Sequence, residues 1–234
     1  GLDGDGNLDF LFCVSGNCMT LPTITQDRID LSPGDELILR FRTWQDYENL
    51  LARRQNRAGL RIRYNSATQE IRIMSPLPGH GKNADMLADL VKALLRHQGK
   101  DWEAFTPITL KRIDRQGVEP DYCFYIENRA QILGKERIDL ENDPPPDLAI
   151  EIDLTSTTNP EDYQAIGVPE LWIYRRDRLL IYCFDGKQYR ECQTSPHFRT
   201  HNIKTLMPQY VNRGWQVGSS VALREFEQFL REGD

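Results

Sequence analysis

The chain has 234 residues, of which 39% are hydrophobic and 27% are charged, and its formal net charge is −6. This length can bury a sizeable core, and the composition is that of an ordinary globular protein, which argues against a disordered chain. No run approaches the roughly 18 apolar residues that a membrane-spanning helix needs. We therefore expect a folded protein without a membrane partner, and the net charge argues against indiscriminate binding of nucleic acid.

Five cysteines are scattered along the chain. They are Cys13, Cys18, Cys123, Cys183 and Cys192. An odd number at wide spacing does not fit a disulfide framework, whereas reduced thiols are usual in the cytosol. We therefore expect free thiols and a cytoplasmic location.

Residues 1–18 differ in character from the rest of the chain. They contain D-G-D-G-N-L-D, which resembles part of a calcium-binding loop. In that register Phe12 stands where the loop needs a bidentate glutamate, so we do not expect a working calcium site. Because Met19 opens a conventional sequence, we expect residues 1–18 to be an upstream extension and residues 19–234 to form a single domain.

The first half of the chain predicts a helix, a hairpin and a second helix. Residues 43–55 begin with a threonine cap and carry apolar side chains at helical spacing. The stretch L-R-I-R-Y-N-S-A-T-Q-E-I-R-I-M, residues 60–74, alternates on both sides of N-S-A-T, which predicts a hairpin. After the break S-P-L-P-G-H-G, residues 83–97 show the longest clear amphipathic helix pattern.

Strand-like segments dominate the second half of the chain. They cover about 103–112, 121–126 and 147–154, and they continue after a short helix near 160–166 through E-L-W-I-Y, R-L-L-I-Y-C-F and K-Q-Y-R-E-C. The D-G pair before the last of these is a strong signal for a hairpin turn. A closing helix is expected at roughly 220–231. A strand-rich centre with helices at both ends predicts an α/β (α+β) fold with a mixed sheet.

Arginines concentrate between residues 39 and 63, where seven of them stand against two acids, a local balance of 7 − 2 = +5. They are Arg40, Arg42, Arg53, Arg54, Arg57, Arg61 and Arg63. A solvated helix and strand face would explain this cluster. A surface for phosphate contacts would explain it too, because the arginine fork matches phosphate oxygens.

The stretch P-P-P-D-L-A-I-E-I-D-L-T-S, residues 144–156, places several acids in one strand. Successive side chains of a strand point to opposite faces, so the apolar residues share one face and the acids share the other. These acids are Asp147, Glu151 and Asp153. Like charges on one face repel, so burial requires a positive group among them or protons that stay bound.

A fourth acid, Asp121, begins a neighbouring strand in V-E-P-D-Y-C-F-Y-I, directly after a proline. Two carboxylates from neighbouring strands can share a hard divalent cation such as Mg²⁺ or Mn²⁺, which prefers oxygen ligands. Such a cation beside Asp121 and Glu151 would let Glu151 and Asp153 stay ionised together. A solvated acidic face is the alternative, and spacing alone does not decide between the two.

Three motifs follow one another along the chain: V-E-P-D-Y, P-P-D-L-A-I-E-I-D-L-T-S and Y-Q-A-I-G-V-P-E-L-W-I-Y. Together with T-W-Q-D-Y-E-N-L-L and I-M-S-P-L-P-G-H, they resemble the Uma-two family of bacterial restriction endonucleases, which is similar to the PD-(D/E)XK nuclease superfamily. The resemblance covers roughly residues 43–190. It implies a restriction-endonuclease-like fold, with a mixed central sheet flanked by helices, and an endonuclease that hydrolyses phosphodiester bonds of DNA.

The resemblance also implies a metal site. Its ligands would be the Asp of the P-D motif and the Glu of the E-x-x motif, here Asp121 and Glu151, with the backbone carbonyl of Ile152 as a further ligand. The metal would lower the pKa of a bound water and neutralise charge on the phosphate. The cofactor implied is Mg²⁺ or Mn²⁺.

The chain departs from the family pattern at the catalytic lysine. The superfamily places this lysine two residues after the Glu of the E-x-x motif, where this chain has Asp153. Many family members place it four residues before the tyrosine that opens the Y-Q-A-I-G-V-P-E motif, here Tyr163, and Asn159 stands at that position. Lys82, at the start of the long helix, is the candidate substitute, although a solvated helix-start residue is the simpler interpretation. Asp153 is either a second metal ligand or a solvated edge acid.

Two functions follow from this departure. The first is a metal-dependent endonuclease with DNA as its partner. The second is a catalytically degraded relative that binds nucleic acid or a protein partner without cleavage. A homodimer is expected only by analogy with enzymes that cut both strands of a duplex.

One histidine and one Cys/His cluster are further candidates for metal ligands. His80 lies in a Pro/Gly loop, and we expect it to be structural or exposed, with a supporting role at the metal site as the alternative. The spacing of Cys192, His197 and His201 is not a recognised zinc motif, and we do not expect zinc there.

Overall fold

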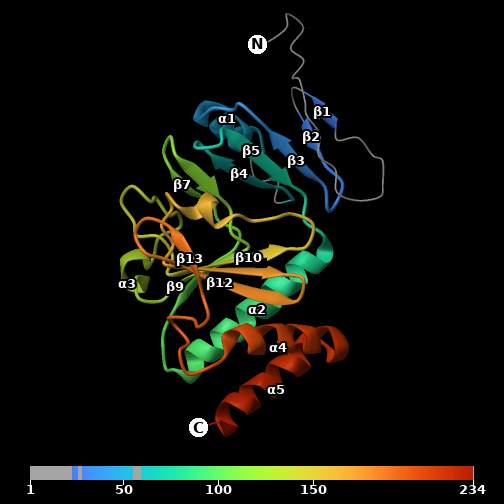
Figure 1. Cartoon of the computed structure of the whole chain (residues 1–234), viewed down its shortest axis with the longest axis vertical. Helices are drawn as coiled ribbons and strands as arrows, with labels where there is room; N and C mark the ends of the chain where they lie inside the picture. Colours follow the sequence, from blue (N-terminus) through green and yellow to red (C-terminus); the bar gives the residue numbers. More distant parts are fainter. Residues whose placement is uncertain (1–22, 26–27, 55–58, 234) are drawn as a thin grey trace, which may run out of the picture.

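The computed structural model describes residues 23–25, 28–54 and 59–233. The predicted extension at residues 1–18 and Arg57 of the basic segment lie outside these ranges. Figure 1 shows two multi-stranded sheets stacked along the long axis of the molecule, with the helices Trp44–Arg54 (α1) and Ser219–Glu232 (α5) at opposite ends. None of the helices in the described part of the chain combines the length and the apolarity needed to cross a membrane.

The larger sheet has six strands in the order β13-β12-β11-β10-β9-β6. Their bounds are Glu103–Phe105 (β6), Tyr122–Tyr125 (β9), Leu148–Asp153 (β10), Glu170–Arg175 (β11), Arg178–Phe184 (β12) and Tyr189–Cys192 (β13). The two central strands β10 and β11 run parallel, and every other neighbouring pair in this sheet is antiparallel. This topology confirms the predicted mixed sheet.

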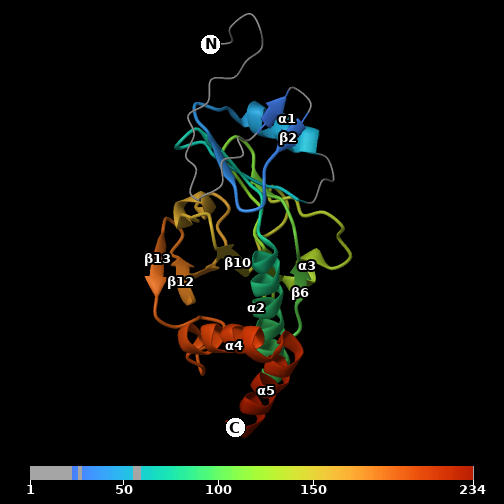
Figure 2. The ribbon, with the colours of Figure 1, turned by 90° about the vertical axis from the view of Figure 1, so that its right-hand side faces the viewer.

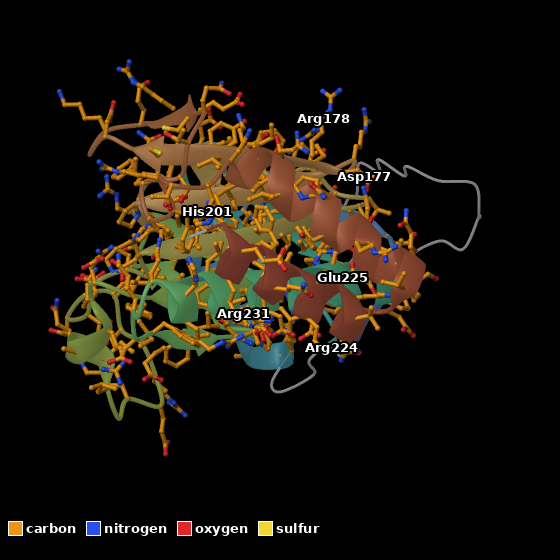
Figure 3. The ribbon with its side chains drawn as sticks, turned by 90° about the horizontal axis from the view of Figure 1, so that it is seen from below. Asp177, Arg178, His201, Arg224, Glu225 and Arg231 are labelled. Atoms are coloured by element: carbon orange, nitrogen blue, oxygen red, sulfur yellow. The ribbon has the colours of Figure 1, made fainter. Side chains whose placement is uncertain are left out.

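Helices cover one face of the larger sheet. They are Pro78–His97 (α2), Ile203–Val217 (α4) and α5. The apolar side chains of β10 pack in one core cluster with α2, and each fully buried aliphatic side chain there contributes about 1.5–3 kcal/mol. Figures 1 and 2 show these helices gathered beneath the sheet, and Figure 3 shows α4 and α5 across the lower surface. The alternation of β10 therefore turns its acids away from the helices.

The smaller sheet has five antiparallel strands in the order β3-β5-β4-β8-β7. Their bounds are Glu36–Leu39 (β3), Arg61–Asn65 (β4), Glu70–Met74 (β5), Leu110–Arg112 (β7) and Gln116–Val118 (β8). Helix α1 covers one face through the buried Tyr47. Tyr47 passes so close to Gly117 that a Cβ atom there would lie 2.1 Å from its hydroxyl oxygen, so only glycine fits at this point of β8.

Short elements complete the described fold. They are the paired strands Thr23–Thr25 (β1) and Arg28–Asp30 (β2), the helix Arg129–Ile132 (α3) and the 3₁₀ helix Pro160–Tyr163 (η1). The expected helix near 160–166 is this single 3₁₀ turn. The hairpin at 60–74, the first helix and the D-G turn are confirmed.

The structure corrects the start of the long helix. The sequence predicts a break before residue 83, whereas α2 begins at Pro78. Proline is tolerated in the first turn of a helix, where its missing N–H would have no intrahelical partner. The correction matters because it places His80 on the helix and not in a loop, and Lys82 in the first turns of the same helix.

Two other elements differ from expectation. The single strand expected at about 103–112 is divided between the two sheets, as β6 and β7, because Pro107 interrupts it. Helix α4 was not predicted, since Pro208 and Gly214 break its helical pattern. It forms because Met207 and Val211 are buried in the main core.

Candidate active site

Asp121 and Glu151 face each other across two neighbouring strands. Strands β9 and β10 are antiparallel, with Tyr122 opposite Ile150, so one further step in this register places Asp121 opposite Glu151. The Asp121 amide donates a hydrogen bond of 3.1 Å to the Ile150 carbonyl, which extends the ladder to this step. Both side chains are buried, at 3% and 4% exposure. Two like charges in this position repel, so they need positive partners.

Those positive partners come from the smaller sheet. Arg63 of β4 donates through Nη2 to Oε1 of Glu151 at 2.9 Å, and Arg61 Nε lies 3.8 Å from Oδ1 of Asp121. The alternation of R-I-R-Y turns both arginines away from the core that Ile62 and Tyr64 share with α1. The basic face of one sheet therefore meets the acidic edge of the other.

Arg63 also ties down the segment that follows β10. Its guanidinium lies 3.3 Å from Oδ2 of Asp162 and 3.3 Å from the Thr158 hydroxyl. Asn65, two residues further along β4, donates to the other oxygen of Asp162 at 3.0 Å. Although burial opposes its charge, Glu151 and Asp162 raise the pKa of Arg63 above its ordinary value, so the guanidinium stays protonated.

Helix α2 and β10 together orient Asp121. His80 Nε2 lies 2.7 Å from Oδ1, and the Ile152 amide donates to Oδ2 at 2.8 Å. His80 was expected to be structural or exposed, and only the exposed part of that expectation is wrong, because His80 is buried on the first turn of α2. Its contact with Asp121 favours the alternative, a support for the site.

Both carboxylate oxygens of Asp153 accept hydrogen bonds from neighbouring residues. Asp153 is the register partner of Arg175 in β11, which donates to Oδ2 from Nε at 3.0 Å and from Nη2 at 2.6 Å. Thr158 donates to both oxygens, through its amide at 2.9 Å and its hydroxyl at 2.7 Å. The interpretation of Asp153 as a solvated edge acid is wrong, since the side chain is buried and fully hydrogen-bonded.

Glu151 is buried with hydrogen bonds to only one of its carboxyl oxygens from the described residues. Burial raises the pKa of its carboxyl to about 8, with Arg63 opposing the rise and the charge of Asp121 adding to it. The Tyr163 hydroxyl donates to the same oxygen, Oε1, that Arg63 contacts, and burial raises the pKa of this tyrosine far above its ordinary value. Among the described residues, no hydrogen bond reaches Oε2 of Glu151. One oxygen of the carboxyl is therefore open to a further partner.

A small hollow lies where the two sheets meet. Its lining residues are Glu36, Arg61, Ile62, Arg63, Arg72, Met74, Glu119, Glu151 and Ser156. The walls thus carry guanidinium groups from the smaller sheet and carboxyl groups from both sheets. Glu119 is itself paired, because Arg54 and the Ile62 amide both donate to its Oε2, at 2.5 and 2.8 Å.

The donor set fits a hard cation with few protein ligands. Asp121 and Glu151 offer carboxylate oxygens side by side, and Oε2 of Glu151 carries no hydrogen bond from the described residues. Within the described ranges, no group of three or more His, Cys, Asp or Glu side chains could hold a metal. A cation here would therefore keep several waters, as Mg²⁺ does when one or two carboxylates bind it.

Lys82 lies in a different contact. Its Nζ lies 3.9 Å from the centroid of the Trp215 ring, on the side of α2 that meets α4. In the Cys/His cluster, His197 Nδ1 lies 2.6 Å from Oε2 of Glu170. In the described part of the chain, the cationic side chains beside Asp121 and Glu151 are the arginines of β4, Arg61 and Arg63.

Most of the residues that surround Glu151 were not predicted from the sequence. Tyr163, Asp162 and Thr158 come from the segment after β10, in which the sequence drew attention only to Asn159, at a position of the family's lysine. One signal was available: Arg61 and Arg63 are spaced by two residues in a predicted strand, so they share a face. A buried row of acids needs positive partners or bound protons, so such a cationic face is one candidate for its partner.

The fold belongs to the mixed α+β class, and its buried acid pair lies at the junction of two sheets. The chain belongs to the Uma2 family, whose model carries the description "Putative restriction endonuclease" and matches residues 44–216. No curated protein matches the chain. Among solved structures, the chain is similar to a protein from Anabaena variabilis ATCC 29413 described as "a putative nuclease belonging to DUF820", with 16% identity and a TM-score of 0.46, covering 70% of this chain and 97% of that one.

Proposed function

We propose that the protein is a divalent-cation-dependent endonuclease that hydrolyses phosphodiester bonds of DNA. The observation that carries the proposal is the pair of buried carboxyl groups, Asp121 and Glu151, placed opposite each other beneath the two arginines of β4. Membership of a restriction-endonuclease family supports the same chemistry.

Each residue of the site has a role in this proposal. Asp121 and Glu151, with the Ile152 carbonyl, would hold Mg²⁺ or Mn²⁺, which supplies an activated water and neutralises charge on the phosphate. His80 fixes the orientation of Asp121. Asp153 serves the structure through its closed ion pair with Arg175.

We assign the role of the missing lysine to Arg63. Its guanidinium is protonated, lies 2.9 Å from Glu151 and lines the hollow beside the acids. A guanidinium can donate to two phosphate oxygens at once, which an ammonium group does less well. Lys82, the candidate from sequence, lies against Trp215, and we do not give it this role.

A catalytically degraded relative is the second candidate. Asn159 stands where many relatives carry lysine, and Arg63 is paired with Glu151, which reduces its freedom to reach a phosphate. Such a protein would keep the basic surface and bind nucleic acid without cleaving it.

A cleavage assay separates the two candidates. Supercoiled plasmid and single-stranded DNA would be incubated with Mg²⁺ or Mn²⁺ and the wild type, Asp121→Asn or Glu151→Gln. The control is Glu136→Ala, an acid exposed in another loop. We expect cleavage by the wild type and the control, and none by the two site variants or in EDTA. Cleavage that survives in both site variants contradicts the proposal, and an inactive wild type that still binds Mn²⁺ favours the degraded relative.

Two-fold pairing remains an analogy with enzymes that cut both strands of a duplex. We propose a homodimer on that ground only. Light scattering of the protein with and without duplex DNA measures its mass directly, and a monomer in both conditions contradicts this part of the proposal.

A further inference from the structure

Phe41 is the most exposed of the large apolar side chains in the described part of the chain, at 86%. It lies in the segment between β3 and α1. Figure 1 shows α1 at the end of the molecule opposite α5. A single exposed apolar side chain is ordinary on a protein surface, so the exposure of Phe41 gains meaning only together with its backbone geometry and the charges beside it.

The backbone at Phe41 is held in a conformation that a bulky residue rarely adopts, with φ +57°. The chain is fixed on both sides of it. Leu39 pairs with Ile71 in the sheet, and the Arg42 amide donates to the Gln69 carbonyl at 2.8 Å. The Tyr64 hydroxyl also donates to the Arg42 carbonyl, at 3.3 Å. The fold therefore maintains a strained turn that presents the phenyl ring to solvent.

Three arginines and one glutamate connect the turn at Phe41 with the strand beside Arg63, a local balance of 3 − 1 = +2. Arg40 and Arg42 flank Phe41 in sequence, and Arg40 Nε lies 3.2 Å from Glu70. Glu70 in turn contacts Arg72 at 3.4 Å, and Arg72 lies opposite Arg63 in the sheet. Gln69, whose carbonyl accepts the hydrogen bond from the Arg42 amide, is three residues from Arg72 in the chain, so the two lie at most about 10 Å apart.

We propose that Phe41 stacks on a base of the nucleic-acid substrate, while Arg40 and Arg42, which follow β3, and Arg72 of β5 contact its phosphates. This inference rests on the proposed function, because it names a contact of the same substrate. A nucleobase offers a flat face to the ring, and its backbone offers the negative charge that Arg40, Arg42 and Arg72 complement. A protein surface that docked here would have to cover arginines along with one isolated ring. Phe41 also lies outside residues 44–216, so it is not part of the match to the family.

Binding is tested without cleavage, in EDTA, by fluorescence anisotropy of short fluorescein-labelled oligonucleotides, single-stranded and duplex. The variants are Phe41→Ala, Phe41→Trp and Phe41→Gly. The matched control is Ile113→Ala, which removes another exposed apolar side chain, at 58%, beside a residue of positive φ. We expect Phe41→Ala to weaken binding about tenfold and Phe41→Trp to retain it, because stacking needs the aromatic face.

Thermal unfolding of the same variants gives an independent readout. Glycine adopts positive φ without strain, so Phe41→Gly is expected to raise the melting temperature by about 2 °C while it weakens binding. A lower melting temperature would mean that the ring packs in the folded state, and it overturns the inference. Equal binding by Phe41→Ala and Ile113→Ala also overturns it, as does a wild type that binds neither oligonucleotide.

The outcome for the proposed function is separate. Phe41-dependent binding with no cleavage in Mg²⁺ or Mn²⁺ supports this inference and contradicts the nuclease. Cleavage that Glu151→Gln abolishes, with binding that does not depend on Phe41, supports the nuclease and overturns this inference.

Discussion

Glu151 and Asp153 lie two residues apart on β10, share a face and are both buried, yet their surroundings differ. Asp153 receives hydrogen bonds on both oxygens, from Arg175 and Thr158. Glu151 receives them on one oxygen, and burial raises its pKa to about 8. A buried carboxylate with hydrogen bonds to both oxygens can stabilise the fold. When one oxygen lacks a hydrogen bond, burial disfavours the charged form, and a bound cation would stabilise that form most.

The largest expected effect separates these two acids by activity. Glu151→Gln removes a proposed ligand and is expected to lower the rate of DNA cleavage about a thousandfold. Asp153→Asn keeps the shape of the closed cluster, and we expect less than a tenfold change. Plasmid-nicking rates in Mg²⁺ measure both. Equal losses in the two variants would place Asp153 in the reaction and remove the distinction.

The next effect is on stability and concerns the ion pair of Asp153. Arg175→Met leaves a buried carboxylate without its cation and is expected to lower the free energy of unfolding by about 3 kcal/mol. The control is Arg178→Met on the same hairpin, an exposed arginine labelled in Figure 3, with an expected change below about 0.5 kcal/mol. Urea denaturation measures both. A loss under about 1 kcal/mol for Arg175→Met would show that the cluster contributes little.

Arg63 gives a smaller effect, because Arg63→Lys keeps the charge. Arg63 contacts Asp162 through Nη1 and Glu151 and Thr158 through Nη2, and the single nitrogen of lysine cannot reproduce this planar fork, so the phosphate contact would lose its fixed geometry. We expect cleavage to slow about tenfold and the protein to stay folded. Cleavage kinetics and a melting curve of the same sample check the two parts. A faster Arg63→Lys enzyme would mean that the ion pair with Glu151 restrains the site.

The smallest effect is a pH dependence of the metal-free protein. The pKa of Glu151 is about 8 in the folded protein, against an ordinary value of 4.5 that we take for the unfolded chain. Between these two pH values the folded state therefore binds more protons than the unfolded state. Its free energy of unfolding should therefore fall as pH rises from about 5 to 8. Glu151→Gln should flatten this slope. Chemical denaturation in EDTA across that range measures it, and an unchanged slope in the variant would mean that Glu151 does not retain its proton.

Much of the fold follows from the sequence because its patterns are local. The alternation of residues 60–74 specifies the hairpin of β4 and β5, and the alternation of residues 147–154 specifies which side of β10 is acidic. Helix α4 does not follow, because its stability comes from packing on the sheet and not from its own spacing. The start of α2 was predicted too late because S-P-L-P-G-H-G is typical of a break, although a helix tolerates proline in its first turn.

The acids of the site could be predicted, and their partners could not. Asp121 and Glu151 belong to strands whose pairing is a simple register, and the structure places them opposite each other. Arg63 and Tyr163 reach Glu151 from segments 88 and 12 residues away in the chain. Contacts between separate sheets depend on tertiary packing, for which one sequence holds no periodic signal. Charge balance indicates only that some cation must be near.

The most direct measurement is the binding of Mn²⁺, followed by electron paramagnetic resonance of the free ion. The wild type, Asp121→Asn, Glu151→Gln and Asp153→Asn would be titrated side by side. We predict saturable binding by the wild type and by Asp153→Asn, and its loss in Asp121→Asn and Glu151→Gln. Binding that Glu151→Gln retains, or that Asp153→Asn alone loses, would contradict the assignment of the open carboxyl pair as the metal site.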